Sequence, residues 1–172
     1  MSQTYTSAGT SINRTKLPAV YKKAHFFSKN ILDYGCGQYT KHIEEYVKSL
    51  NKIYLPYDPF NQPVQEQMAT DEKLNLLLAN NCPVDVVCSN VLNVIDDEEE
   101  IQSIAKGIMS IIMRTGGFGF ITVYEGDKSG IGRQTGKDQY QRNEPLKNYL
   151  KYFSGHIKVR ASIRNGMIFL FR

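Results

Sequence analysis

Short apolar runs alternate along this chain with longer segments in which apolar residues recur at helical spacing. The runs occupy residues 31–34, 52–57, 84–89 and 118–124, and they are rich in Ile, Val, Leu and Tyr, as buried parallel strands are. The intervening segments 40–50, 62–81 and 97–114 repeat apolar residues at intervals typical of helices. This alternation predicts a mostly parallel sheet with helices packed on its faces.

The last of these helices has clear start and stop signals. Asp96 or Asp97 is a suitable N-cap, three glutamates follow in the first turn, and Gly116-Gly117 ends the helix. A further helix is expected within 17–27, where Pro18 is a suitable first helical residue.

The C-terminal part predicts a polar loop, a short helix and a hairpin. The loop covers 125–142, the helix lies near 144–153, and two strands at about 156–163 and 166–171 flank Asn165-Gly166. Asn-Gly between apolar runs is the strongest short hairpin signal. The predicted fold class is therefore α/β, with a doubly wound, mostly parallel, seven-stranded and Rossmann-like sheet that ends in an antiparallel hairpin.

Length and composition favour one domain over residues 1–172, with residues 1–15 as a flexible tail. No apolar stretch approaches the roughly 18–20 residues that span a bilayer, and the polar N-terminus lacks a signal-peptide core. The three cysteines have no C-x-x-C spacing, which argues against a disulfide framework and a zinc site. We expect no metal, no membrane association and a cytoplasmic location.

Charge is distributed unevenly along the chain. Residues 1–30 hold five Lys/Arg and no acid, residues 31–127 hold six against fifteen acids, and residues 128–172 hold ten against two. The basic flanks suit a phosphate-bearing partner if they meet in space. Candidate contacts to nucleic acid are Arg14, Lys16, Arg133, Lys137 and Arg142, and a protein partner stays open.

The segment Ile31-Leu32-Asp33-Tyr34-Gly35-Cys36-Gly37 carries the clearest chemical signal. It is a strand that runs directly into a glycine turn, where the backbone can come close to a ligand. About twenty residues on, the next strand ends at Asp58, placed to accept hydrogen bonds from ribose hydroxyls. Gly-x-Gly alone is weak, but this strand and acid context makes nucleotide binding the favoured prediction.

These motifs resemble the class I S-adenosylmethionine-dependent methyltransferases. Asp33-x-Gly35-x-Gly37 is similar to their first motif, with Tyr39 at the third glycine position, and DVVCSNVLNVI at 85–95 is similar to their fourth-strand motif. The resemblance implies S-adenosylmethionine as cofactor and methyl transfer as activity. The cofactor contacts that it implies are Asp33, Gly35, Gly37, Asp58, Pro59, Asn90 and Val91.

A narrower resemblance covers most of the chain. Segments 11–17, 57–60, 89–97 and 132–141 resemble methyltransferase-like proteins encoded with bacterial DNA phosphorothioation systems and their small phage-borne relatives. Asp58-Pro59-Phe60 differs from the (D/N)-P-P-(Y/F) motif of DNA amino-methyltransferases, because it lacks the second proline and follows the second strand.

Acceptor recognition is expected in the loop 125–142, since it follows a strand at the edge where ligands bind in open α/β sheets. The catalytic candidates are Glu125 as a base, Asn93 as an orienting residue and Tyr140 as a stacking aromatic. Asn93 could equally stand at the start of a helix. The acceptor is expected to be nucleic acid or nucleotide-like. The alternatives are a small molecule, a protein, or a non-catalytic protein that kept the cofactor fold and acts through a partner.

Overall fold

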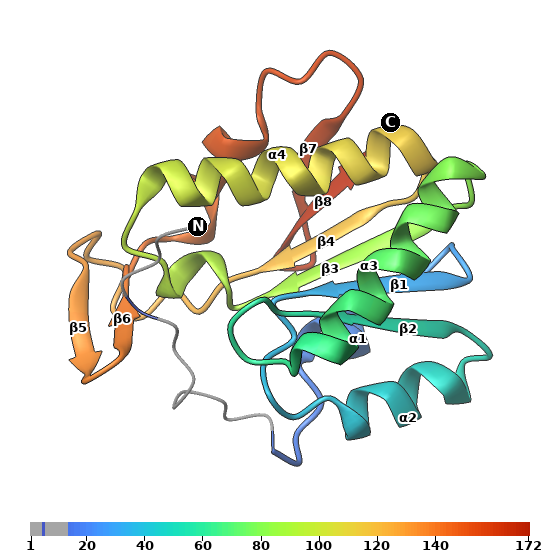
Figure 1. The fold of residues 1–172 in the computed structure, drawn as a ribbon. Helices are drawn as coiled ribbons and strands as arrows, with labels where there is room; N and C mark the ends of the chain where they lie inside the picture. Colours follow the sequence, from blue (N-terminus) through green and yellow to red (C-terminus); the bar gives the residue numbers. More distant parts are fainter. Residues whose placement is uncertain (1–4, 6–13) are drawn as a thin grey trace.

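Six strands form one mostly parallel sheet in a computed structural model that describes Tyr5 and residues 14–172 (Figure 1). The order across the sheet is β2-β1-β3-β4-β8-β7. The first four are mutually parallel, β8 runs antiparallel to β4, and β7 runs antiparallel to β8. The strands are β1 (Asn30–Tyr34), β2 (Ile53–Tyr57), β3 (Val84–Ser89), β4 (Gly119–Thr122), β7 (Arg160–Arg164) and β8 (Met167–Phe171).

The α/β class, the parallel body and the C-terminal hairpin are as predicted, but the sheet has six strands in the described residues, not seven. A single helix, α3 (Val64–Ala79), leads from β2 directly to β3, so β2 is left at the edge of the sheet. At the other end, Asn165 and Gly166 join β7 to β8 with φ of +51° and +70°. Two successive positive φ angles match the twist of a tight hairpin, and Asn-Gly is the pair that adopts them most readily.

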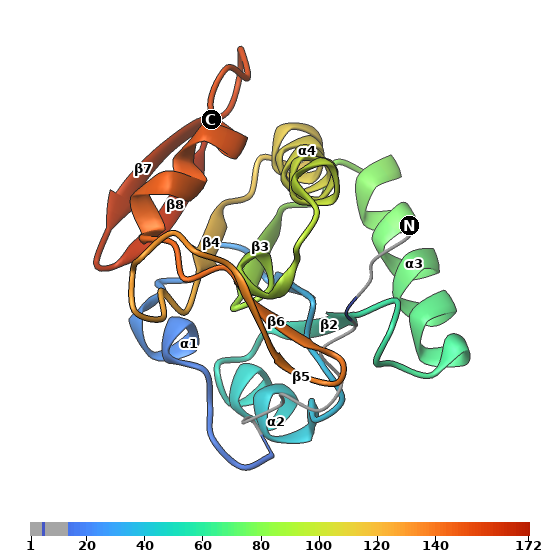
Figure 2. The same ribbon diagram turned by 90° about the vertical axis from the view of Figure 1, so that its left-hand side faces the viewer.

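The helices cover the sheet unequally. Figure 2 shows α3 and α4 (Glu98–Thr115) on one face and α1 (Ala19–Lys23) and α2 (Lys41–Ser49) on the other. Within the described residues, two 3₁₀ segments, η2 (Leu92–Val94) and η3 (Leu146–Phe153), connect these elements. Asp97 is the N-cap of α4 and accepts from the amide of Glu99, and Gly116 ends the helix with φ +73°. The helix expected within 17–27 is only five residues long, because the backbone is extended again at Ala24.

Each face of the sheet has its own buried core. The larger core lies under α4 and η3 and includes Ile108, Ile112, Phe153 and Leu170. The smaller core lies under α1 and α2 and includes Val20, Ile43, Val47 and Phe120. Along β8 the side chains alternate between the two faces, which is the pleat of a strand covered on both sides.

Asp85 is a buried residue near the start of β3 that binds two neighbouring segments through hydrogen bonds. Its fully buried carboxylate accepts from the amides of Phe27 and Ser28 (2.7 and 2.9 Å), from the Ser28 hydroxyl (2.6 Å) and from the amide of Phe118 (3.0 Å). One side chain on β3 thus accepts from three backbone amides in two other segments. A buried carboxylate requires such donors, because burial without hydrogen bonds is costly.

The segment 125–142 differs from the expected loop. Arg133–Gly136 and Gln139–Gln141 pair as a small antiparallel ribbon, β5 and β6, which projects beyond the carboxyl ends of the parallel strands (Figures 1 and 2). The predicted tail, residues 1–15, lies outside the described residues except for Tyr5, Arg14 and Thr15. In the part of the chain that the structure describes, no helix is long and apolar enough to span a membrane.

Candidate functional site

The carboxyl ends of β1 and β3 mark the point where the chain reverses its direction across the sheet. From β1 the chain passes through α2 to β2 on one side, and then through α3 to β3 on the other side. The two connections leave from opposite faces, so a crevice between the strand ends is the usual ligand position in open α/β sheets. The predicted glycine turn and Asn90-Val91 both lie at this position.

The glycine turn is held against the end of β2. The amide of Gly35 donates to the carbonyl of Tyr57 at 2.7 Å, and Gly35 and Gly37 have φ of +81° and +71°. A Cβ atom at Gly35 would overlap the side chain of Val91. Glycine is therefore required here for two reasons: its backbone conformation and the close approach of the segment that follows β3.

Asp58 connects the end of β2 to this turn. The residue is 6% exposed; Oδ2 accepts from the amide of Gly37 at 3.0 Å, and Oδ1 accepts from the amides of Phe60 and Asn61 at 3.0 Å each. The side-chain amide of Asn61 donates to both carboxylate oxygens at 3.2 Å. A carboxylate offers about four acceptor positions. Backbone donors take three of them here, and the side-chain amide of Asn61 occupies the last.

The carboxylate of Asp33 is buried inside the protein. The residue is 3% exposed, and its Oδ2 accepts from the hydroxyl of Tyr54 at 2.8 Å. Burial raises the pKa of this carboxyl from 3.8 to about 6, although the bond from Tyr54 favours the ionised form. The carboxylate of Asp33 thus joins β1 to Tyr54 of β2 inside the protein.

The other cofactor candidates lie around the same turn. Asn90 is exposed with φ +58°, and its amide donates to the carbonyl of Thr122 at 2.8 Å. Pro59 is exposed directly after Asp58, and Val91 is half-buried over Gly35. Tyr39, at the third glycine position of the motif, has the guanidinium of Arg14 over its ring at 5.1 Å. Gly35, Gly37, Asp58 and Val91 are therefore brought together.

Asn93 is buried, with 2% of its surface exposed, and it connects three segments through hydrogen bonds. Its amide nitrogen donates to Oε1 of Gln141 at 3.1 Å, and its Oδ1 accepts from the amide of Tyr124 at 3.3 Å. Gln141 in turn donates to the carbonyl of Tyr124 at 2.9 Å. These bonds fix the β5–β6 ribbon to η2 and to the end of β4. Both polar atoms of the Asn93 side chain therefore already have partners.

Glu125 and Tyr140, the other catalytic candidates, are engaged elsewhere. Glu125 accepts from the amide of Leu146 at 2.7 Å and pairs with Lys128 at 2.9 Å. The bond from Lys128, followed by that from Leu146, lowers the pKa of Glu125, which weakens it as a base. The ring of Tyr140 stacks on Tyr5 at 5.7 Å between ring centroids. The three catalytic candidates thus have separate partners, and none of these contacts joins one candidate to another.

The predicted basic contacts divide into two groups. Arg14, Lys16, Arg133 and Lys137 are exposed, the last two on the β5–β6 ribbon and its turn. Arg142 is the exception, and its inclusion in a basic surface was wrong.

Arg142 is 9% exposed, and all of its guanidinium nitrogens are used internally. Nε and Nη2 each bond Oε1 of Glu144 at 3.0 Å, Nη1 donates to the carbonyls of Ile95 and Asp96, and Nη2 approaches Glu98 at 3.5 Å. Arg142 therefore joins the start of α4 to η3.

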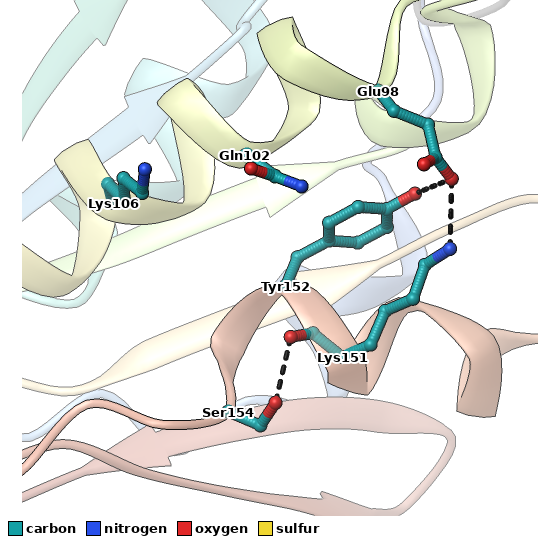
Figure 3. A pocket seen from close by; sticks show the side chains of 6 residues that line it. All are labelled: Glu98, Gln102, Lys106, Lys151, Tyr152 and Ser154. Atoms are coloured by element: carbon teal, nitrogen blue, oxygen red, sulfur yellow. Dashed lines mark hydrogen bonds and ion pairs between the residues drawn. The ribbon is translucent and has the colours of Figure 1, made fainter.

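A groove of about 310 Å³ lies on the outer side of α4, against η3 (Figure 3). Glu98 accepts there from the hydroxyl of Tyr152 at 2.8 Å and from Lys151 at 2.9 Å. The remaining lining residues are Gln102, Lys106 and Ser154. None of the residues at the ends of β1, β2 and β3 lines this groove, so it is separate from the glycine turn.

No protein-family model matches the chain, and no curated protein or solved structure matches it significantly. The contacts of three residues were missed from the sequence: Asn61, Tyr54 and Gln141, the last of which lies in the loop 125–142 expected to recognise the acceptor. Asn61 stands three residues after Asp58, a spacing typical of side chains that close a turn, so a local signal existed. The roles of Tyr54 and Gln141 depend on contacts between residues far apart in the sequence, which no local pattern reveals.

Among the described residues, no group of three or more His, Cys, Asp or Glu side chains could hold a metal ion.

Proposed function

We propose that this protein is an S-adenosylmethionine-dependent methyltransferase with a nucleic acid or nucleotide-like acceptor. One observation carries the proposal. Asp58, at the end of β2, hydrogen-bonds the amide of Gly37 in a glycine turn at the reversal point of the sheet. This is the arrangement in which an acid on the neighbouring strand holds ribose hydroxyls while glycines admit the rest of a nucleoside.

The residues fit a ribose after one exchange. The side-chain amide of Asn61 spans both oxygens of Asp58 at 3.2 Å. A ribose hydroxyl can take its place, because the three backbone bonds to Asp58 would remain. The cost of releasing one neutral donor is small, since the amide can bond water instead.

The resemblance to methyltransferases favours S-adenosylmethionine over NAD, and the antiparallel hairpin β7–β8 at the end of the sheet agrees with it as a fold-level analogy. The bound sulfonium would supply an already activated methyl group. The work left to the chain is to orient the acceptor and exclude water. The β5–β6 ribbon is the element placed for this, because it projects from the carboxyl edge and Asn93 anchors it through Gln141.

The structure also offers an argument for the non-catalytic alternative. The carboxylate of Asp58 is fully satisfied within the chain, and Val91 occupies the space above Gly35. A protein that retained the fold without binding a cofactor would show the same contacts.

Calorimetric titration with S-adenosylmethionine, and separately with NAD, tests the proposal. We expect saturable binding of S-adenosylmethionine that is lost in Asp58→Ala and retained or tightened in Asn61→Ala, because that variant removes the competing donor. Glu66→Ala, an exposed acid on α3, is the matched control and should bind as the unaltered protein does. Absence of binding by a protein with an intact melting transition would contradict the enzyme and favour the non-catalytic alternative.

A further inference from the structure

The face of the β7–β8 hairpin that points away from α4 carries a row of aromatic rings. Met167, Phe169 and Phe171 alternate along β8 with Ile168 and Leu170, which belong to the core under α4. The three therefore lie on the opposite face, where α1 is short and covers β4. Figure 2 shows the hairpin at the end of the sheet with α1 beside it and α4 on the other face.

The aromatic row consists of Phe27, Phe118, Phe169 and Phe171, which come from three separate segments. Neighbouring ring centroids lie 4.5 Å apart for Phe27 and Phe118, 5.5 Å for Phe118 and Phe169, and 5.6 Å for Phe169 and Phe171. The last two pairs are stacked, with interplanar angles of 12° and 22°. Phe27 is 57% exposed, and the other three rings are half-buried.

The row is bordered by cations. The guanidinium of Arg164 lies over Phe169 and Phe171 at 4.9 and 5.3 Å, and Arg160 is the cross-strand partner of Phe171. Lys23 of α1 reaches the hairpin turn, with Nζ 3.8 Å from where a Cβ of Gly166 would lie. Within the described chain, none of Lys23, Arg160 and Arg164 forms an ion pair.

Acidic residues are missing from both segments that meet here. Residues 14–32 hold five Lys/Arg and residues 145–172 hold six, with no Asp or Glu in either. The basic flanks of the sequence are therefore joined in space by the contact between α1 and the hairpin turn. The fully buried carboxylate of Asp85 accepts from the amides of Phe27 and Phe118 at 2.7 and 3.0 Å, and among the described residues it forms no ion pair with Lys23, Arg160 or Arg164.

We propose that the aromatic row and its bordering cations bind single-stranded nucleic acid. The exposed ring of Phe27 provides a face on which an unpaired base can stack, and the half-buried rings with the guanidinium plane of Arg164 extend that surface. Arg160 and Lys23 would neutralise backbone phosphates on either side. A duplex hides its base faces, so this surface discriminates against paired strands. The inference is independent of the proposed methyl transfer, because the row lies at the opposite end of the sheet from Asp58.

Fluorescence anisotropy of a labelled oligothymidylate, measured without cofactor, tests the proposal. We expect Phe27→Leu, which keeps an apolar side chain but removes the ring, to weaken binding by about five- to 150-fold, the loss of one stacked base. Arg160→Gln should lower the slope of log affinity against log salt by about 0.7, one phosphate contact. Arg164→Lys should weaken binding although the charge is kept, because it removes the planar surface.

The matched controls lie on α3, far from the row: Leu76→Ala for an exposed apolar residue and Lys73→Gln for a cation. Both should leave the affinity unchanged, and Phe27→Leu should leave binding of S-adenosylmethionine unchanged. The proposal is overturned if the oligonucleotide does not bind at low salt, if Phe27→Leu binds as tightly as the unaltered protein, or if a duplex binds equally well. Failure of the cofactor titration alone would not bear on it.

Discussion

The buried carboxyl group of Asp33 should make this protein less stable as pH rises, and Asp33→Asn should remove that dependence. Its pKa is 3.8 in the unfolded chain and about 6 in the folded one, because burial disfavours the ionised form. Between these values the folded chain binds more protons than the unfolded chain, so the free energy of unfolding falls with rising pH. The full difference corresponds to about 3 kcal/mol. For a domain of this size, that is about 6–12 °C in melting temperature.

The assay compares urea unfolding of the two proteins from about pH 4 to about pH 8, so that contributions from all other groups cancel. The amide that Asp33→Asn introduces can still accept from the Tyr54 hydroxyl, and Tyr54→Phe is measured as well to isolate that bond. We expect the stability of Asp33→Asn relative to the unaltered protein to rise by up to ~3 kcal/mol between about pH 4 and pH 7. Tyr54→Phe should steepen the dependence, because it removes a bond that favours the ionised carboxyl. A difference that stays constant with pH would refute the reasoning.

Three further substitutions test the contacts that shape the sheet and its site. Asp85→Ala should cost about 3–5 kcal/mol of unfolding free energy, because three backbone amides lose their buried acceptor. Gly35→Ala should destabilise by ~1–2 kcal/mol from its positive φ alone, and by more from overlap with Val91, and adding Val91→Ala should recover only the second part. Arg142→Ala should cost about 3–5 kcal/mol, because Glu144 is left as a nearly buried charge without its partner. Chemical denaturation at neutral pH measures all three.

Each of these has a matched control or a contradicting result. Ser28→Ala removes only one donor to Asp85, so a loss as large as that of Asp85→Ala would contradict the role given to the backbone amides. Full recovery of Gly35→Ala by Val91→Ala would show that the positive φ costs nothing. Lys128→Ala breaks an exposed ion pair and should change the free energy of unfolding by less than about 1 kcal/mol. A loss of that size in Arg142→Ala would contradict the role given to the buried pair.

The strands and the larger helices could be predicted because their signals are local. β3 is a short, mostly apolar run that is buried on both faces, and α4 carries its own N-cap and an ending glycine. The turn at Asn165-Gly166 is encoded in two residues whose backbone preferences match it. The glycine turn and Asp58 were also predictable as neighbours, because successive parallel strands end at the same edge.

Other features depend on contacts between distant residues. β5 is exposed and polar, so no apolar alternation marks it, and its pairing with β6 follows from the anchor between Asn93 and Gln141, 48 residues apart. Arg142 has the composition of a surface cation, but partners on α4 and at Glu144 bury it. The aromatic row likewise unites three segments, and only the fold places them together.

The most direct test of the central claim is an amide chemical-shift map of the isotope-labelled protein during titration with S-adenosylmethionine. The account predicts that the largest shifts fall on Gly35, Gly37 and Asn61, with Asn61 Nδ2 changing as its bond to Asp58 is replaced. Residues of the groove around Glu98 should not respond. Saturable shifts confined to that groove, or no shifts at all, would contradict the placement of the cofactor across the ends of β1 and β2.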